Sequence, residues 1–399
     1  MYDAIICGAG PAGSVAALVL ARSGARVLLL DRAAFPRDKP CAEYLSPEAN
    51  IVLRDLGIHD AVQALHPAHL RGFRLYPQIG DGFTATFAGA SGGMVERQYG
   101  LAVSRLQFDA TLVQQAARAG ADVGERTRVL DVVENDARVV LRVARGGGET
   151  TITAPLAVAA DGVHSTVARR LGLVERRAPR RIALVTHLSG LEGLDDYGEM
   201  HLSPAGGYCG IAPFLDGRAN IAMVVDGQEG NRIAGEPLRY FRQALATYPH
   251  IASRARRATP CKAILTTSNM SWRTRRPYSG RILLVGDAAG YYDPFTGEGI
   301  YNALAGGRLA ALHVAAALAG GRVAEHLAAY AAALRHLTRW KHLVARAIDL
   351  VVRRPLLFRH VADRLQRRPE MADILVGVTG DFLPVRAIGN PLYLARLLV

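Results

Sequence analysis

The sequence predicts an α/β fold with three parts: a Rossmann-like dinucleotide-binding domain, an inserted mixed β-sheet domain and a helical C-terminal region. Three observations support this prediction. A β-α-β unit with a glycine-rich turn opens the chain, a β-rich block follows, and a buried strand at 281–285 then leads into a long Ala/Gly-rich helix. Because nucleotide-type segments lie on both sides of the β-rich block, one discontinuous domain with an insertion explains this order better than two consecutive domains.

The composition is that of a folded and strongly basic chain. Half of the 399 residues are hydrophobic and 21% are charged, which is ordinary for a globular protein and excludes disorder on the scale of a domain. The formal net charge of +13 comes almost entirely from arginine, since the chain contains only three lysines. A basic surface attracts anionic partners, but no nucleic-acid-binding module is visible, so we expect no nucleic-acid partner.

The cysteines limit which metal or disulfide sites the chain can form, and the apolar segments bear on where in the cell the protein is located. Cys7, Cys41, Cys209 and Cys261 are scattered without a C-x-x-C pair, so we expect neither a metal site nor a disulfide framework. The chain starts directly with a strand, and no apolar run reaches the ~18–20 residues of a membrane span. We therefore expect a cytoplasmic protein, monomeric or homodimeric, without a signal peptide or a span.

The C-terminal run at 335–368 leaves two alternatives open. Arginine pairs at Arg353-Arg354 and Arg367-Arg368 flank apolar helical turns. Such a segment could make peripheral contact with an anionic membrane or cover a lipophilic pocket. It could equally be a solvated basic helix packed on the domain.

The first motif is the glycine-rich turn between the first strand and the first helix. Gly8 permits the tight turn, Gly10 lets the backbone approach a pyrophosphate, and Gly13 lets helix and strand pack closely. The start of the helix offers free N–H groups and the positive end of the helix dipole to phosphates. Asp31 ends the next strand, where a carboxylate can accept hydrogen bonds from ribose hydroxyls. Together these features predict dinucleotide binding.

Two further motifs follow at a distance. Asp161 lies in a segment that predicts a strand, a turn and a helix N-cap, so it is either a cofactor contact or an ordinary turn residue. Asp287 ends the buried strand at 281–285 and is placed to bind the hydroxyls of an extended polyol. The segment at 293–300, Asp-Pro-Phe-Thr-Gly-Glu-Gly-Ile, opens the following helix with exposed N–H groups.

These three motifs, in this order and spacing, resemble the p-hydroxybenzoate hydroxylase superfamily of flavoproteins. The segment at 104–109 also resembles the family's helix start, where an arginine supports the cofactor. The resemblance implies bound FAD, a glutathione-reductase-type FAD domain, and NAD(P)H as a transient reductant without a second nucleotide fold. It implies FAD-binding segments at 1–70, 100–175 and 262–325, a substrate-binding domain at 71–99 and 176–261, and a helical region at 326–399. It assigns cofactor contacts to Gly8, Gly10, Pro11, Ala12, Gly13, Asp31, Arg32, Cys41, Arg105, Asp161, Gly286, Asp287, Pro294, Gly297, Gly299 and Ile300.

Within the superfamily the chain is most similar to the geranylgeranyl reductase branch and the related flavin halogenases and hydroxylases. The segment at 39–47, Lys-Pro-Cys-Ala-Glu-Tyr-Leu-Ser-Pro, resembles that branch's C-G-E-G-L-S-P motif. The branch's P-x-x-Y-x-W-x-F-P motif has a counterpart at 204–213, in which Gly210 and Ala212 stand at the two bulky aromatic positions. The W-x-W-x-I-P segment of halogenases has no counterpart, which disfavours halogenation.

Three residues are candidates for chemistry. Cys41 could lie over the flavin as an acid or gate, since Arg37 and Lys39 are near in sequence, or it could be an inert buried thiol. Glu43 could orient substrate or relay a proton, or interact with a helix N-terminus. Tyr208 could line the pocket or belong to the core.

The sequence favours one function and leaves two alternatives. Small residues at Gly210 and Ala212 suggest room for a ring, so we expect an NAD(P)H-driven FAD monooxygenase that hydroxylates or epoxidises a lipophilic aromatic, quinone or polyketide in secondary metabolism. The segment at 39–47 favours the alternative, saturation of C=C bonds in an isoprenoid or related lipid. A flavin-binding protein without turnover is the third hypothesis.

Overall fold

The computed structural model describes residues 1–176, 181–203, 206–268, 272–291 and 294–398. The first sheet has the order β21-β22-β12-β1-β2-β8, and it is parallel throughout except for the edge strand β21. Parallel strands are buried on both faces, and the apolar runs of the sequence reflect this. The strands are β1 (Ala4–Cys7), β2 (Val27–Leu30), β8 (Asp122–Gly124), β12 (Leu156–Ala159), β21 (Tyr278–Ser279) and β22 (Ile282–Leu284).

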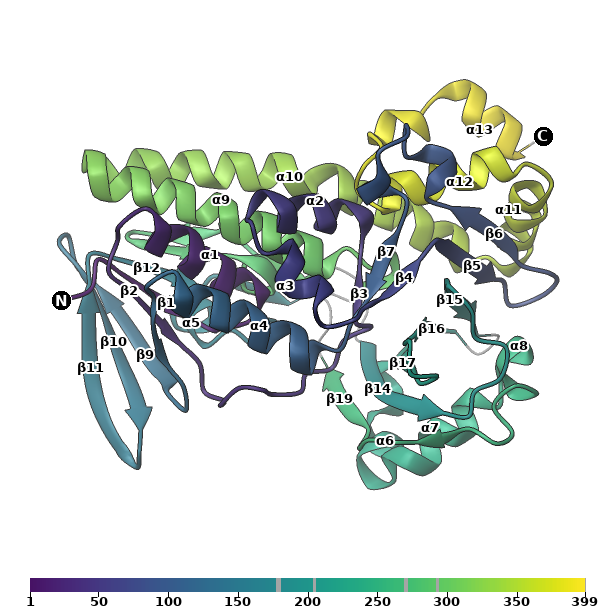
Figure 1. The fold of residues 1–399 in the computed structure, drawn as a ribbon, viewed down its shortest axis with the longest axis horizontal. Helices are drawn as coiled ribbons and strands as arrows, with labels where there is room; N and C mark the ends of the chain where they lie inside the picture. Colours follow the sequence, from purple (N-terminus) through teal and green to yellow (C-terminus); the bar gives the residue numbers. More distant parts are fainter. Residues whose placement is uncertain (177–180, 204–205, 269–271, 292–293, 399) are drawn as a thin grey trace.

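Helices cover one face of this sheet and a three-stranded meander covers the other (Figure 1). Alternate residues of β1 show the division: Ile6 packs with the helices, and Ile5 packs with the meander. The helices are α1 (Pro11–Arg22), α4 (Arg105–Arg118) and α9 (Gly299–Gly320), and the meander is β9 (Arg128–Glu134), β10 (Val139–Arg145) and β11 (Gly148–Ala154).

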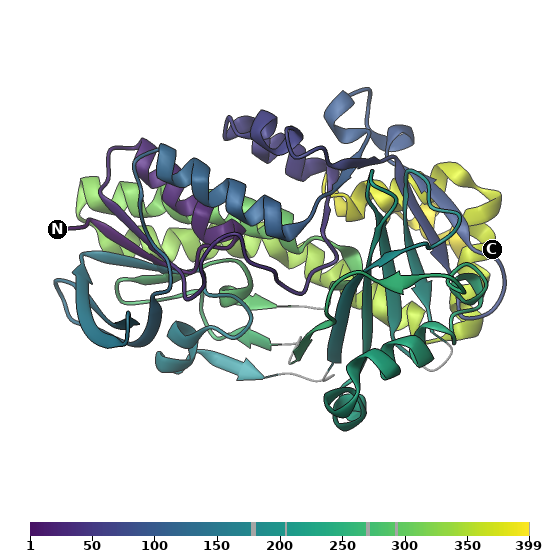
Figure 2. The ribbon, with the colours of Figure 1, turned by 60° about the horizontal axis from the view of Figure 1, so that its bottom comes forward.

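A second, eight-stranded sheet forms the other part of the molecule (Figure 2). Its order is β18-β14-β17-β16-β15-β5-β6, with β19 also paired to β14. Strands from the block at 71–99 and from the block at 176–261 therefore share one sheet, through the parallel pair β5-β15. The strands are β5 (Gly72–Tyr76), β6 (Phe83–Thr86), β14 (Arg181–Ser189), β15 (Tyr197–Leu202), β16 (Tyr208–Pro213), β17 (Ala219–Asp226), β18 (Thr259–Pro260) and β19 (Leu265–Ser268).

The two faces of the second sheet have different covers. Cys209, Ile211 and Met223 pack against short helices, whereas Tyr208 and Val224 point to the opposite face and pack with Phe358 of the C-terminal region. The short helices are α6 (Gly230–Gly235), α7 (Pro237–Leu245) and α8 (Pro249–Ala252), and the C-terminal helices are α10 (Val323–Val352), α11 (Pro355–Arg367), α12 (Pro369–Thr379) and α13 (Pro391–Leu398).

Short elements connect these layers. They comprise β3 (Tyr44–Leu45), α2 (Pro47–Asp55), α3 (His59–Gln63), β4 (Ala68–Leu70), β7 (Gly100–Ala102), α5 (Thr166–Arg170), β13 (Val174–Arg176), β20 (Trp272–Thr274) and β23 (Gly290–Tyr291), with 3-10 turns at Ala88–Ala90, Val95–Arg97, Gly227–Glu229, Gly286–Ala289, Pro294–Thr296 and Val385–Ala387.

Helix α9 corrects one expectation from the sequence. Its 22 residues are long and apolar enough to cross a membrane, contrary to the expectation that no segment is. The structure places it instead along α1 and α10, with Leu304, Ala310 and Val314 fully buried. An alanine- and glycine-rich helix can approach its neighbours closely, and Gly307 lies so near Ala12 of α1 that an added Cβ would be 2.4 Å from its carbonyl oxygen.

Candidate functional site

The glycine-rich turn has the geometry of a phosphate cradle. Gly8 adopts φ +104°, and a Cβ there would lie 2.4 Å from the carbonyl oxygen of Ala160. A Cβ on Gly13 would lie 1.8 Å from the carbonyl oxygen of Gly8, so this position admits glycine alone. At Gly10 the nearest atom to an added Cβ is 3.7 Å away, on Arg37, so the space in front of Gly10 is open. The backbone at the start of α1 therefore faces a space that a pyrophosphate can enter.

Asp31 holds this turn in place. Its two carboxylate oxygens accept hydrogen bonds from the backbone N–H groups of Ala9 and Ala33, each at 2.9 Å. Each oxygen retains a lone pair, so the carboxylate can also accept a ribose hydroxyl. Arg32 is exposed beside it.

Asp161 caps a helix. Its Oδ2 accepts the N–H groups of Thr166 at 2.7 Å and Val167 at 3.2 Å, at the start of α5. Burial raises the pKa of Asp161, and these hydrogen bonds act in the opposite direction. The side chain therefore has the turn-and-cap role that was one of its two interpretations, and its contact with the cofactor stays a prediction.

The downstream motif lies opposite the glycine turn. Gly286 adopts φ +58°, and Asp287 follows β22, with its Oδ2 3.9 Å from the Nζ of Lys39. A Cβ on Gly299 would meet nothing within 4 Å, so the start of α9 is also open. Ile300 is buried behind it. Pro294 begins the 3-10 turn before α9, and Asp293 lies outside the described residues.

A cavity of about 900 Å³ joins these motifs to the second sheet. Its wall on the sheet side is largely apolar, because residues of β14, β15, β16 and β17 point into it. The apolar part of this wall consists of Ala183, Val185, Met200, Tyr208, Gly210, Ala222 and Val224, and Thr267 of β19 lies beside it. On the cofactor side the lining includes Gly10, Pro11, Ala12, Lys39, Cys41, Arg105, Gly286, Asp287, Gly297, Gly299 and Ile300. The structure therefore brings together predicted site residues that are nearly 300 positions apart in the chain.

This lining fits FAD. The open backbone at Gly10 suits a pyrophosphate, the carboxylate of Asp287 suits the hydroxyls of the ribityl chain, and the open start of α9 suits the pyrimidine end of the flavin ring. Between these three positions the cavity is continuous.

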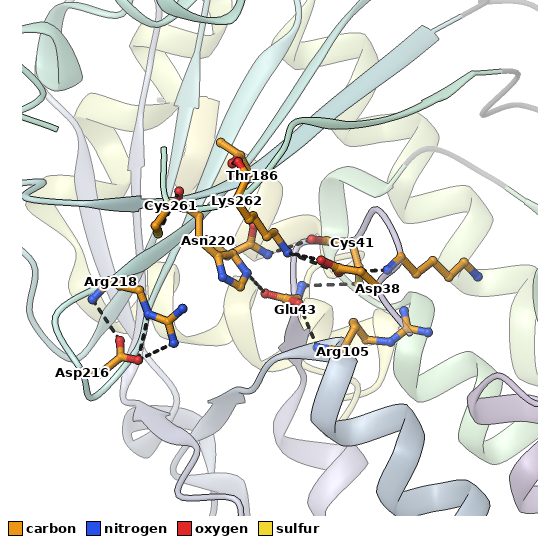
Figure 3. Close-up of polar contacts among 12 residues, drawn as sticks. Asp38, Cys41, Glu43, Arg105, Thr186, Asp216, Arg218, Asn220, Cys261 and Lys262 are labelled. Atoms are coloured by element: carbon orange, nitrogen blue, oxygen red, sulfur yellow. Dashed lines mark hydrogen bonds and ion pairs between the residues drawn. The ribbon is translucent and has the colours of Figure 1, made fainter. Parts of the chain in front are cut away.

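Cys41 lies at the cavity wall, on a loop that is hydrogen-bonded to the second sheet. Its carbonyl oxygen accepts a hydrogen bond from the side-chain amide of Asn220, on β17, at 2.7 Å. On the same loop the carboxylate of Asp38 pairs with Lys262 at 3.1 Å (Figure 3). The thiol lies beside the guanidinium of Arg105.

Glu43 lies behind Cys41 and is fully buried. Its Oε1 accepts the backbone N–H of Arg105 at 2.8 Å (Figure 3). Its Oε2 lies 2.6 Å from the Nε2 of His187 on β14. Its backbone adopts φ +56°, which is uncommon for a residue other than glycine. Glu43 is not among the described residues that line the cavity, so its predicted contact with substrate stays a prediction.

Arg105 is anchored by a buried carboxylate. Its Nε and Nη2 donate to the two oxygens of Asp109 at 2.7 and 2.8 Å, and Arg37 approaches the same carboxylate at 3.0 Å. The two guanidinium groups lower the pKa of Asp109 and more than offset its burial. The cavity therefore has a fixed cationic wall beside Cys41.

Tyr208 lines the cavity from β16. Its ring packs edge-on against Phe295, with the ring centroids 5.1 Å apart. Gly210, two residues along the strand, also faces the cavity, whereas Ala212 packs in the core with Tyr44 and Ala102. Only the first of the two small residues therefore enlarges the cavity.

A cluster of buried charges was missed by the sequence analysis. Lys341 of α10 makes an ion pair with Asp381 and lies 3.9 Å from the carboxylate of Glu298, at the start of α9. Asp381 also accepts the hydroxyl of Ser46 at 3.1 Å. Burial raises the pKa of Glu298 to about 8, and the negative charge of Asp381 acts in the same direction. Glu298 and Lys341 both line the cavity, so a carboxyl that can hold a proton at neutral pH lies within it.

Comparison with known proteins places the chain in a family. Residues 1–345 match the model of an FAD-binding domain family. Digeranylgeranylglycerophospholipid reductase 2 of Methanopyrus kandleri is 30% identical over 316 residues, covering 77% of this chain and 76% of that protein. Menaquinone reductase of Mycobacterium tuberculosis is 32% identical over 327 residues, covering 77% and 75%. The chain spans 63% of the length of another relative, conditioned medium factor receptor 1 of Dictyostelium discoideum, which is 29% identical.

Solved structures show the same fold. A geranylgeranyl bacteriochlorophyll reductase-like protein from Thermoplasma acidophilum has a TM-score of 0.82 and 22% identity, covering 100% of this chain and 99% of that one. A myxobacterial chondrochloren halogenase, described as FAD-dependent, has a TM-score of 0.78 and 25% identity, covering 86% and 82%. The chain is therefore an FAD-dependent oxidoreductase that belongs to the FAD-binding domain family, in the geranylgeranyl reductase-like branch of the p-hydroxybenzoate hydroxylase superfamily.

Proposed function

We propose that this flavoenzyme saturates C=C bonds in the prenyl chain of a lipid or lipid-like quinone. The observation that carries the proposal is the largely apolar wall of β14, β15, β16 and β17, which lines one cavity together with Cys41 and the flavin motifs. Such a wall suits a hydrocarbon chain, since burial of apolar surface on both sides is favourable. Two relatives at 30% and 32% identity carry reductase names, which supports the same choice.

The chemistry needs one hydride and one proton for each double bond. FAD, held by the glycine turn and Asp287 and reduced by NAD(P)H, would supply the hydride. The protein must supply the proton from a group that lines the cavity and carries one at neutral pH. Several titratable side chains line the cavity, and among them we choose two candidates: Cys41, beside Arg105, and Glu298, whose pKa burial raises to about 8.

The remaining polar residues position these groups. Asn220 and Glu43 hold the loop that carries Cys41. Glu43 accomplishes this through its own backbone, whose N–H donates to the Cys41 sulfur at 3.3 Å. Burial raises the pKa of Glu298, the charge of Asp381 raises it further, and Lys341 lowers it.

Anaerobic turnover tests the proposal. Enzyme reduced in the absence of dioxygen should be reoxidised by a prenylated lipid, with recovery of the visible absorbance of oxidised flavin and gain of two hydrogen atoms by the lipid. Cys41→Ser and Glu298→Gln should each slow this step, and the larger effect identifies the proton donor. If prenyl lipids never reoxidise the reduced enzyme without dioxygen, the proposal is wrong.

One observation favours monooxygenation as the second candidate. Gly210 and Ala222 face each other across β16 and β17, and a Cβ on Gly210 would meet nothing closer than 3.7 Å. This leaves space in the sheet wall that a ring could occupy. The monooxygenase expected from the sequence therefore stays a prediction, and it requires dioxygen consumption that depends on substrate.

A further inference from the structure

The outer face of α10 carries exposed apolar side chains between arginines. Arg339, Leu343, Arg346 and Leu350 are spaced by three or four residues, so they follow one another along one face of the helix. Leu343 is 53% and Leu350 is 55% exposed, and Trp340, next to this row, is 47% exposed. We call Arg339, Trp340, Leu343, Arg346 and Leu350 the α10 stripe. The buried face of α10, with Tyr330 and Val344, packs toward the protein interior.

Among the described residues, the arginines of the stripe have no acidic partner. In the parts of the chain that the structure describes, no carboxylate pairs with Arg339 or Arg346. The guanidinium of Arg339 lies over the ring of Trp340, 4.8 Å from its centroid. Arg335, one turn earlier, is also without an ion pair in those parts. A row of uncompensated positive charge is thus mixed with exposed tryptophan and leucine.

The stripe borders the cavity. Arg335, His336, Arg339, His342 and Arg346 all contribute to the cavity lining, although each is exposed at the surface. The apolar interior described above therefore opens beside this face of α10. A molecule that enters from the direction of the stripe passes arginines first and the apolar wall of the second sheet later.

We propose that the α10 stripe docks the enzyme on an anionic membrane surface, with the cavity mouth facing the lipid. Arginines attract anionic headgroups, while tryptophan and leucine enter the interfacial region. Docking would let an apolar substrate move from the bilayer into the cavity without crossing water. The docking itself is independent of the reaction, but the delivery of substrate rests on the proposed function.

The charge and apolar character of the stripe favour an anionic membrane over two other partners, a second copy of the chain and a nucleic acid. A second copy of the chain would place the unpaired arginines of two stripes against each other, which is unfavourable. A nucleic acid would satisfy the arginines but would leave Leu343 and Leu350 exposed to phosphates and water. An anionic bilayer satisfies both kinds of side chain.

Vesicle sedimentation tests the proposal with the FAD-loaded enzyme. Wild-type protein should sediment with vesicles of phosphatidylcholine and phosphatidylglycerol, less at high salt, and poorly with phosphatidylcholine alone. Leu343→Gln/Leu350→Gln should weaken binding by at least about tenfold, because the interface loses buried apolar area. Arg339→Gln/Arg346→Gln should weaken it by about thirtyfold, since each arginine near an anionic surface contributes to attraction.

Matched controls lie on other faces. Leu215→Gln/Leu238→Gln removes two exposed leucines, which are 70% and 43% exposed, and Arg118→Gln/Arg145→Gln removes two exposed arginines. Both should bind vesicles like the wild type. Equal losses in stripe and control variants would mean that total charge or hydrophobicity, not the stripe, governs binding, and would overturn the proposal.

Tryptophan quenching gives a measurement on the wild-type fold. The chain has two tryptophans, and Trp272 is buried. Lipids with brominated acyl chains should quench the wild-type fluorescence, and Trp340→Phe should lose that quenching. Absence of quenching in the wild type would overturn the proposal, as would a wild-type dimer that Leu343→Gln/Leu350→Gln converts to a monomer.

These outcomes are separable from the proposed function. Reduction of prenyl lipids by wild-type enzyme in detergent solution involves no bilayer. If the enzyme fails to reduce prenyl lipids in detergent, the proposed reaction is wrong, and the vesicle-binding result is unaffected. If it succeeds, the docking proposal is still decided by the vesicle experiments alone.

Discussion

The imidazole Nε2 of His187 lies 2.6 Å from the Oε2 of Glu43, and this contact joins the second sheet to the loop that carries Cys41. Both side chains are buried, and the other oxygen of Glu43 accepts the backbone N–H of Arg105, at the start of α4. One carboxylate thus connects strand β14 of the second sheet with helix α4, which packs on the first sheet. The cavity lies between these two parts of the molecule.

Removal of His187 should loosen the Cys41 loop. His187→Ala leaves a buried carboxylate without one partner, which should lower the free energy of unfolding by about 3 kcal/mol. The loosened loop should also expose Cys41, so the rate at which a thiol reagent modifies Cys41 should rise. The measurement uses a Cys261→Ser background, in which Cys41 is the one cysteine that is not buried, since Cys7 and Cys209 are buried. His187→Gln, which keeps an N–H donor, should restore part of both properties. An unchanged modification rate in His187→Ala would show that the contact does not position Cys41.

Two alanine substitutions in the glycine turn should have different effects. Gly13→Ala places a Cβ against the carbonyl oxygen of Gly8, so the fold itself should lose about 3 kcal/mol or more. Gly10→Ala has room in the protein, so it should fold normally and lose FAD affinity because the methyl group occupies the approach to the pyrophosphate. Thermal unfolding without FAD and titration with FAD measure the two effects. Normal FAD affinity in Gly10→Ala would contradict the placement of the phosphates.

Asp287→Ala should weaken FAD retention. Loss of hydrogen bonds from a carboxylate to the cofactor corresponds to about ten- to hundredfold weaker binding. The measurement is the dissociation constant from flavin fluorescence. Asp60→Ala is the control, because the Asp60 side chain is fully exposed outside the cavity. Full flavin occupancy in Asp287→Ala after extensive dilution would contradict the assigned role.

The raised pKa of Glu298 should appear as a pH dependence of stability. Between the ordinary carboxyl pKa and about 8, the folded protein keeps this proton while the unfolded chain releases it, so Glu298 contributes less stability as pH rises. Glu298→Gln cannot lose a proton, so it should become more stable relative to the wild type from pH ~5.5 to pH ~7.5, by up to about 2.5 kcal/mol. Denaturant unfolding of FAD-loaded protein at the two pH values gives the comparison. A stability difference that is constant with pH would show that Glu298 titrates normally.

The sequence could predict the parts of the fold that depend on local patterns. The glycine turn, the strand before Asp287 and the open start of α9 all follow from neighbouring residues, and the structure has each of them. The order of the segments was also sufficient to predict an inserted second sheet, since the nucleotide motifs lie on both sides of it.

The contacts between distant segments could not be predicted in this way. Lys341, Asp381 and Ser46 meet only because α10 and the turn after α12 fold back onto α2, and no local pattern marks that approach. One signal could have indicated Lys341: the chain is rich in arginine and has only three lysines, so each lysine is a candidate for a specific role. Likewise the partner of Glu43 is 144 residues away, so its carboxylate could not be assigned to His187 from sequence.

Isotope labelling tests the proposed reaction most directly. The wild-type enzyme would be turned over with NAD(P)H and a prenylated lipid in deuterated water under heavy-oxygen gas, and the product analysed by mass spectrometry. C=C saturation predicts a product that contains deuterium at the former double bond and no heavy oxygen. A product that contains heavy oxygen and retains its unreduced carbon skeleton would contradict the account and establish the monooxygenase instead.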